Sequence, residues 1–313
     1  MRVFSFLAAL AFSAAALAGA DKTVPPVPAE KVGSAAWVIQ GNRGLPSRAN
    51  RGFINNPAWV VTKDSVVVID PGSSVHIGRM VVDQIRKTTR LPVSHVFNTH
   101  VHGDHWLGNQ AIQEAWPKAV FLGPPGMIQA ARDGADAQWL KLMSDLTEGA
   151  TDGTRAVIPT EATADGKEYR IGGKTFRIHA TTHAHSQADD MIEVVEDRIL
   201  FTGDNVISRQ VMNMMDGSFK GVLKATDRAL AVNALYYVPG HGRFGDRTFV
   251  EEQKAWFEIM LAGVRRLYSE GVMTDFEMKP ILSEKLKAYE KWAGWETDLG
   301  RQISLAILEV EQE

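Results

Sequence analysis

The sequence predicts an α/β protein in which two β-sheets pack together as a sandwich and carry helices on the outside. In the first part of the chain, short apolar segments typical of strands alternate with amphipathic helical segments. A second strand-rich part begins near residue 168 and is again followed by helical segments. Two strand-rich halves that are each followed by helices are typical of two sheets that share one core.

Composition narrows the class of protein. The chain has 313 residues, of which 45% are hydrophobic and 23% are charged, with a formal net charge of -3. These values are typical of a folded protein, and a slightly acidic chain is not expected to bind nucleic acid. Because there is no Cys, disulfides, thiolate metal ligands and Cys nucleophiles are excluded. A metal ion would have to be bound by His, Asp or Glu.

The N-terminus resembles an export signal. Arg2 precedes the apolar stretch 3–17, and Ala18-Gly19-Ala20 fits a site at which a signal peptidase cuts. We expect residues 1–20 to be a signal peptide cut after Ala20, which makes the mature protein periplasmic or secreted, with no stable membrane anchor. An uncleaved anchor is the alternative, but a spanning helix needs about 20 strongly apolar residues, and this stretch is shorter and rich in Ala.

The expected elements of the first part follow an extended leader at 21–33. The strand at 65–70 ends at the turn Asp70-Pro71-Gly72, and the helix after it has apolar residues on one face, spaced as in a helix. In chain order we expect strands at 36–40, 58–62 and 65–70, a helix at 75–88, a strand at 92–98, a helix at 106–115 and a strand at 119–122.

An insertion at about 124–165, helical over 127–146 and loop-like over 149–165, separates the two strand-rich parts. Long loops in compact domains are often functional lids, and a surface excursion without function is the alternative. Gly172-Gly173 is typical of a hairpin turn. The remaining expected elements are strands at 168–171, 174–180, 191–195 and 198–202, a helix at 225–235, a strand at 236–238 and a helical C-terminal region at about 248–313, all within a single domain at 34–313.

The segment Thr99-His100-Val101-His102-Gly103-Asp104-His105 carries the strongest chemical signal. It places three imidazoles and one carboxylate within six residues, directly after an expected strand. A loop at a strand end can direct such side chains toward a common centre, and imidazole and carboxylate groups at this density suit zinc or iron. A solvated loop rich in His is the less informative alternative.

His100-x-His102-x-Asp104-His105 resembles the signature of the metallo-β-lactamase superfamily of metallohydrolases. Further motifs of that family occur in the expected order. Asp70 precedes this segment, and Ala184-His185-Ser186, Thr202-Gly203-Asp204 and Pro239-Gly240-His241 follow it. The resemblance covers about residues 34–250. It implies a four-layer αβ/βα sandwich of two mixed sheets with helices on both outer faces.

The resemblance also implies a site for two divalent metal ions. His100, His102 and His185 would bind one ion, and Asp104, His105 and His241 the other. Asp204 would bridge the two ions. Asp104 would also act in catalysis by orienting the attacking water or moving its proton. Asp70 would not bind an ion itself, but would hold a ligand or a loop in place. We expect zinc, with iron or manganese as alternatives.

The third motif leaves one choice open, because His183 lies two residues before His185. On an extended backbone two residues apart point to the same side, so spacing does not separate them. We favour His185, since His185-Ser186-Gln187-Ala188-Asp189 resembles the family's turn more closely. Asp70, Asp204 and His241 each have a turn residue without metal contact as the alternative.

The expected function is hydrolysis by an exported enzyme with two metal ions. A bridging Asp204 resembles the thioesterase and lactonase members, so we expect a small ester, thioester or lactone as substrate. A metallo-β-lactamase acting on β-lactam antibiotics and a metal-binding accessory protein without turnover are the alternatives. The segment 50–56, followed by the stretch 66–73, is similar to exported zinc metallohydrolases associated with sulfur-oxidation and quinoprotein systems. This similarity indicates a location rather than a substrate.

Overall fold

The computed structural model describes residues 24–313, and the expected signal peptide at 1–20 lies outside this range. Two mixed sheets pack face to face. Within the described residues, the first sheet has seven strands, which lie side by side in chain order from β1 to β7. The pairs from β1 to β4 are antiparallel, and those from β4 to β7 are parallel. The strands are β1 (Glu30–Val32), β2 (Ala36–Val38), β3 (Ala58–Val61), β4 (Val66–Ile69), β5 (Val93–Phe97), β6 (Val120–Gly123) and β7 (Glu161–Ala162).

The second sheet has five strands. Its strands are antiparallel except for the parallel pair of β11 and β12, and their spatial order is β12 (Tyr236–Pro239), β11 (Ile199–Gly203), β10 (Ala188–Val194), β9 (Lys174–Thr182) and β8 (Glu168–Ile171). The inner faces of the two sheets share a core in which Phe97 stacks against Phe176 at 6.0 Å between ring centroids. The alternation of buried and partly exposed residues along β9 fits a strand with one face in this core.

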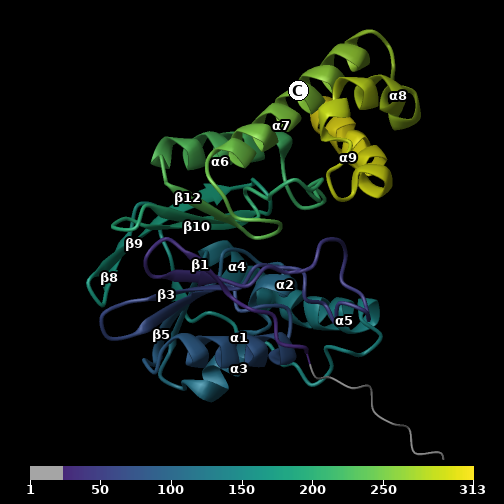
Figure 1. The fold of residues 1–313 in the computed structure, drawn as a ribbon. Coiled ribbons are helices and arrows are strands. Elements are labelled where there is room, and N and C mark those ends of the chain that lie inside the picture. The colour runs from purple at the N-terminus through teal and green to yellow at the C-terminus, as the bar shows by residue number, and fades with distance from the viewer. Residues whose placement is uncertain (1–23) are drawn as a thin grey trace, which may run out of the picture.

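Helices cover both outer faces, so the predicted four-layer architecture is confirmed. Helices α1 (Val75–Thr88) and α3 (Asn109–Ala115) cover the first sheet, and α6 (Phe219–Val232) and the start of α7 (Thr248–Ser269) cover the second (Figure 1). Ser74 begins α1 by accepting a hydrogen bond from the backbone N–H of Ile77 at 3.3 Å. The expected apolar face of α1, which includes Ile77, is buried.

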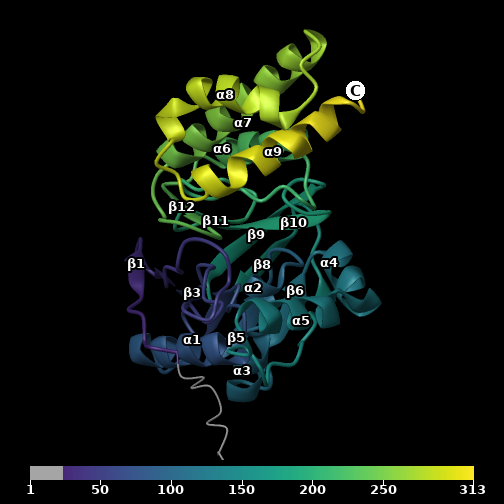
Figure 2. The same ribbon diagram turned by 90° about the vertical axis from the view of Figure 1, so that its right-hand side faces the viewer.

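The C-terminal helices form a second small core beside the sandwich. Helices α8 (Asp275–Lys285) and α9 (Trp295–Val310) pack on α7, with the short 3₁₀ turn at 287–289 between them. Figures 1 and 2 show this group extending away from the sheets. Thr274 caps α8, accepting a hydrogen bond from the N–H of Glu277 at 3.2 Å and donating one to its carboxylate at 2.7 Å. None of the helices within residues 24–313 is long and apolar enough to cross a membrane.

Three expected elements differ in the structure. Residues 30–32 of the expected leader form β1, because they pair with β2. The expected helix at 106–115 is divided into α2 (Gly103–Trp106) and α3, since the Gly108 N–H donates to the carbonyl of Gly72 instead of continuing one helix. The expected helix at 127–146 is divided into α4 (Pro125–Ala130), a π-helical turn at 131–135 and α5 (Asp136–Leu146), since Gly134 has a φ of 111°.

Candidate metal centre

The predicted site residues follow the carboxyl ends of strands that meet at one edge of the sandwich. Asp70 follows β4, the segment with His100 follows β5, His185 lies between β9 and β10, Asp204 follows β11, and His241 follows β12. Carboxyl ends of neighbouring parallel strands open on the same edge of a sheet, where ligand sites commonly form. Residues separated by up to 171 positions in the sequence thus reach one centre.

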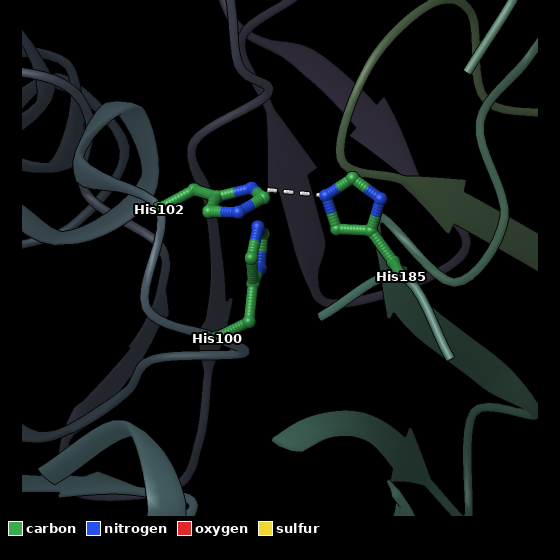
Figure 3. A group of neighbouring side chains, drawn as sticks. All are labelled: His100, His102 and His185. Atoms are coloured by element: carbon green, nitrogen blue, oxygen red, sulfur yellow. Dashed lines mark hydrogen bonds between the residues drawn. The ribbon is translucent and has the colours of Figure 1, made fainter. Parts of the chain in front are cut away.

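His100, His102 and His185 form the first group. Their ligating nitrogens all lie within 4.8 Å of one another, and Figure 3 shows the three rings pointing toward a common centre. His102 Nδ1 and His185 Nε2 are 3.0 Å apart, and His100 Nε2 is buried without a hydrogen-bond partner. Three imidazole nitrogens that face each other in a buried site leave room for a cation and supply the lone pairs to bind it.

Asp104, His105 and His241 form the second group, with Asp204 beside them. His105 Nε2 lies 3.4 Å from Asp104 Oδ2, 3.3 Å from Asp204 Oδ1 and 3.3 Å from His241 Nε2. His241 Nε2 lies 3.2 Å from Asp104 Oδ2. Ligands at 2.0–2.1 Å from a tetrahedral zinc ion lie roughly 3.3 Å from each other. The spacing of these four side chains therefore fits one tetrahedral ion.

Asp204 connects the two groups. In the second group, its Oδ1 lies 3.3 Å from His105 Nε2 and its Oδ2 lies 3.2 Å from His241 Nε2. The same Oδ2 lies 3.4 Å from His185 Nε2 in the first group. Oδ1 is buried without a hydrogen-bond partner. A carboxylate that lies this close to imidazoles of both groups is placed as a bridging ligand would be.

Most of these imidazoles are held through their second nitrogen, as metal-binding His residues usually are. The Nδ1 atom of His105 lies 2.9 Å from Asp70 Oδ2, and His241 Nδ1 lies 2.9 Å from the carbonyl oxygen of Ile54. Asp70 also accepts hydrogen bonds from the N–H of Thr99 at 2.9 Å and from its hydroxyl at 2.7 Å. Asp70 thereby orients the His105 ring and fixes the start of the loop that carries His100.

The sequence analysis missed two side chains that contact imidazoles of the first group. Asp216 Oδ2 lies 3.0 Å from His102 Nε2, and the Thr99 hydroxyl lies 2.9 Å from His100 Nδ1. Thr99 directly precedes the His-rich segment, and its position could have indicated this role. Asp216 lies 114 positions from His102 in a loop with no motif, so only the fold reveals the contact.

The segment at 50–56 holds the backbone next to two site residues, Asp70 and His241. Asn55 donates to the carbonyl of Asp70 at 3.1 Å, and Asn56 donates to the carbonyls of Pro239 and Gly242 at 2.9 and 2.6 Å. Both side chains are buried. Adjacent buried Asn residues between apolar positions mark a loop held by side-chain hydrogen bonds, so this segment fixes the turn that carries His241.

The structure separates the two candidates of the third motif. His185 is buried in the first group, and His183 is exposed outside both groups. The backbone of His183 has a φ of 49°, so the chain turns there and the alternation of side chains along an extended strand no longer holds. Positions 183 and 185 therefore point in different directions.

The electrostatics of the site suit cation binding. Burial alone would lower the pKa of His241, but the carboxylates of Asp204 and Asp104 raise it to about 10. Burial would raise the pKa of Asp104, but His105 and His241 lower it to about 2. Both carboxylates are thus ionised at neutral pH and hold protons on neighbouring imidazoles. Metal ions would displace those protons, because imidazole binds a metal through a neutral nitrogen.

Two sheets with outer helices, and two groups of His and Asp side chains at one edge, define the class of αβ/βα sandwich proteins with a candidate metal site at the sheet edge. The chain belongs to the metallo-beta-lactamase superfamily, whose family model matches residues 51–241. The family resemblance seen in the sequence is thereby confirmed.

Curated relatives and solved structures agree with this membership. The chain is 27% identical over 201 residues to an atrochrysone carboxyl ACP thioesterase of Emericella nidulans, an alignment that covers 63% of this chain and 53% of that protein. It is 24% identical over 259 residues to a lactamase-like protein of Aspergillus niger, covering 80% of this chain and 70% of that protein. The chain spans about half the length of the thioesterases it matches.

Among solved structures, a metallo-beta-lactamase from Pontibacter korlensis superposes with a TM-score of 0.60 at 18% identity, covering 74% of this chain and 99% of that chain. A metallo-beta-lactamase from Hirschia baltica gives a TM-score of 0.55 at 18% identity, with 74% and 97% coverage. At this identity the similarity shows the fold alone.

Proposed function

We propose that the protein is an exported hydrolase with two divalent metal ions that cleaves an ester, thioester or lactone bond. The observation that carries this proposal is the pair of ligand groups that share Asp204 at the edge of the sandwich. His100, His102 and His185 would hold one ion, and Asp104, His105 and His241 the other. Two relatives named as thioesterases favour an acyl substrate.

Bound metal ions would lower the pKa of a water molecule toward about 7 and so supply a nucleophile at neutral pH. The protein's own residues prepare this step. Asp104 is ionised because His105 and His241 offset the cost of its burial, so it can accept a hydrogen bond from the attacking water and orient it. The pairing of His105 with Asp70 keeps that ring in one orientation, which reduces the reorganisation needed during the reaction.

The first experiment loads the protein with zinc, manganese or iron, measures bound metal, and follows hydrolysis of thioesters, lactones and a chromogenic cephalosporin with and without a chelator. We expect about two ions per chain and thioester or lactone turnover that chelation abolishes. Protein that binds its metals and hydrolyses only the cephalosporin would be a β-lactamase. Full activity after metal removal would refute the proposal, and a loaded protein without turnover would be an accessory protein.

Export is part of the proposal and rests on the sequence of residues 1–20. N-terminal sequencing of the protein recovered from its native host tests it, with Asp21 as the expected first residue. An intact Met1 on protein recovered from the cytoplasmic fraction would contradict export without affecting the proposed chemistry.

A further inference from the structure

The cavity above the metal centre has an apolar wall. Its volume is about 300 Å³, and metal-centre residues, among them Asp104, Asp204 and His241, line it. The lining also includes six apolar side chains, which we call the apolar cleft: Leu45, Trp139, Leu142, Leu146, Met212 and Met215. A larger cavity of about 740 Å³ lies along α1, and none of the predicted site residues lines it.

Three separate segments build the apolar cleft. Trp139, Leu142 and Leu146 lie on α5, where spacings of three and four residues place them on one face of the helix. Leu45 comes from the loop between β2 and β3, and Met215 from the loop after β11. Helix α5 belongs to the insertion at 124–165, so this insertion supplies a wall of the cavity.

The apolar cleft exposes side chains that would ordinarily be buried. Leu45, Leu142, Leu146 and Met215 are 66%, 42%, 40% and 63% exposed. They are four of the ten large hydrophobic residues that are exposed within residues 24–313. Single exposed apolar residues are common on protein surfaces, but a group that surrounds one cavity indicates a surface that a ligand covers.

The position of the apolar cleft determines which part of a ligand it would cover. The carboxylates of Asp104 and Asp204 line the cavity. The polar reacting bond of a substrate is expected there, and the group bonded to it is directed along the leucines and methionines. A volume of about 300 Å³ lies at the small end of ligand sites, so the cleft suits a short or medium chain better than a long lipid.

We propose that the apolar cleft binds the acyl group of the substrate and makes the enzyme selective for medium-length hydrophobic acyl chains. This inference rests on the proposed function. In the reaction, water adds to the acyl carbon, the bond from that carbon to sulfur or oxygen breaks, and the thiol or alcohol leaves with a proton. The released product is an amphipathic carboxylic acid.

The test is a series of N-acetylcysteamine thioesters with acetyl, butyryl, hexanoyl and octanoyl groups, assayed with zinc-loaded protein. Each two added methylenes should raise kcat/KM by about tenfold until the cleft is filled, because each buried methylene favours transfer out of water. A series in which kcat/KM stays level or falls from acetyl onward would overturn the inference. The proposed function would stand in that case, since acetyl turnover that a chelator abolishes tests the metal chemistry alone.

Variants of the apolar cleft test whether its side chains cause the preference for longer acyl chains. Leu142→Ser combined with Leu146→Ser should lower the ratio of octanoyl to acetyl kcat/KM about tenfold. Both side chains are about 40% exposed, so the change is not expected to prevent folding. The matched control is Leu308→Ser on α9, which makes the same change at a side chain that is 54% exposed and outside the cavity. An equal ratio in the double variant and the control would overturn the inference.

A binding measurement keeps the inference testable if no thioester is hydrolysed. Nile red, an apolar fluorescent dye, should bind the loaded protein and be displaced by octanamide. Binding should weaken at least about threefold in the double variant and remain unchanged in Leu308→Ser. Equal binding in both would reject the apolar cleft as an acyl site, and weakened binding without any turnover would reject the proposed reaction alone.

Discussion

Gly240 offers a test of the site that needs no knowledge of the substrate. It directly precedes His241, and a Cβ atom built on it would lie 1.9 Å from Asp204 Oδ1 and 2.8 Å from His105 Cε1. Gly240→Ala therefore introduces one methyl group between two proposed ligands. The backbone cannot easily retreat, because the Gly240 N–H donates to the carbonyl of Gly203 and the N–H of Asn56 donates to the carbonyl of Gly240, each at 2.8 Å.

The size of the effect follows from these distances. Real Cβ contacts essentially never fall below 3.0 Å, so the Asp204 carboxylate must move by at least 3.0 − 1.9 = 1.1 Å. Metal–ligand distances tolerate about 0.2 Å, so this displacement removes the bridging ligand from its place. We expect metal affinity to fall about tenfold to hundredfold. We expect kcat/KM to fall about hundredfold.

Metal content after dialysis, and competition with a chromogenic chelator, measure the loss. Gly245→Ala is the matched control, because its Cβ would meet Phe249 at an ordinary 3.5 Å. Thermal melting in chelator establishes that both variants fold. If Gly240→Ala bound metal as tightly as Gly245→Ala, Asp204 could not be a ligand held in the observed position, and the reasoning would be wrong.

Three further predictions follow from individual contacts. His185→Asn should lower metal content and activity strongly, while His183→Asn should change neither, because only position 185 lies in the ligand group; a reversed outcome in metal analysis would assign the ligand to His183. Asp216→Leu, which removes the partner of the distal nitrogen of His102, should weaken metal binding about tenfold to hundredfold in a chelator titration, and an unchanged titration would show that this contact does not support the ligand. Burial raises the pKa of Asp190 from 3.8 to about 7, so the folded state binds more protons than the unfolded state between those values, and its stability falls as pH rises across that window. Asp190→Asn should remove a penalty of a few kcal/mol, so its advantage in melting temperature over the wild type should grow from pH 4.5 to pH 8; an advantage that stays constant would mean that Asp190 does not titrate there.

Most residues of the candidate site could be predicted from the His-rich segment and from the order of the other motifs. His100, His102, Asp104 and His105 are close in the chain, so their proximity in space needs only one loop. The strands were also predictable, because β4 is a continuous apolar run that ends at Asp70. Such local patterns survive folding, since each reflects the period of one element and the turn that ends it.

Contacts between distant segments were decided by the tertiary structure. His183 and His185 are equivalent by spacing, and the left-handed backbone at 183 directs only the second toward His100 and His102. The pairing of Asp216 with His102 and the position of α5 over the metal centre depend on how loops from different strands meet. The sequence alone determined the family, the metal-binding residue types and the outline of the two sheets. The shape of the cavity came from side chains far apart in the chain, because no short-range pattern records which loops pack against each other.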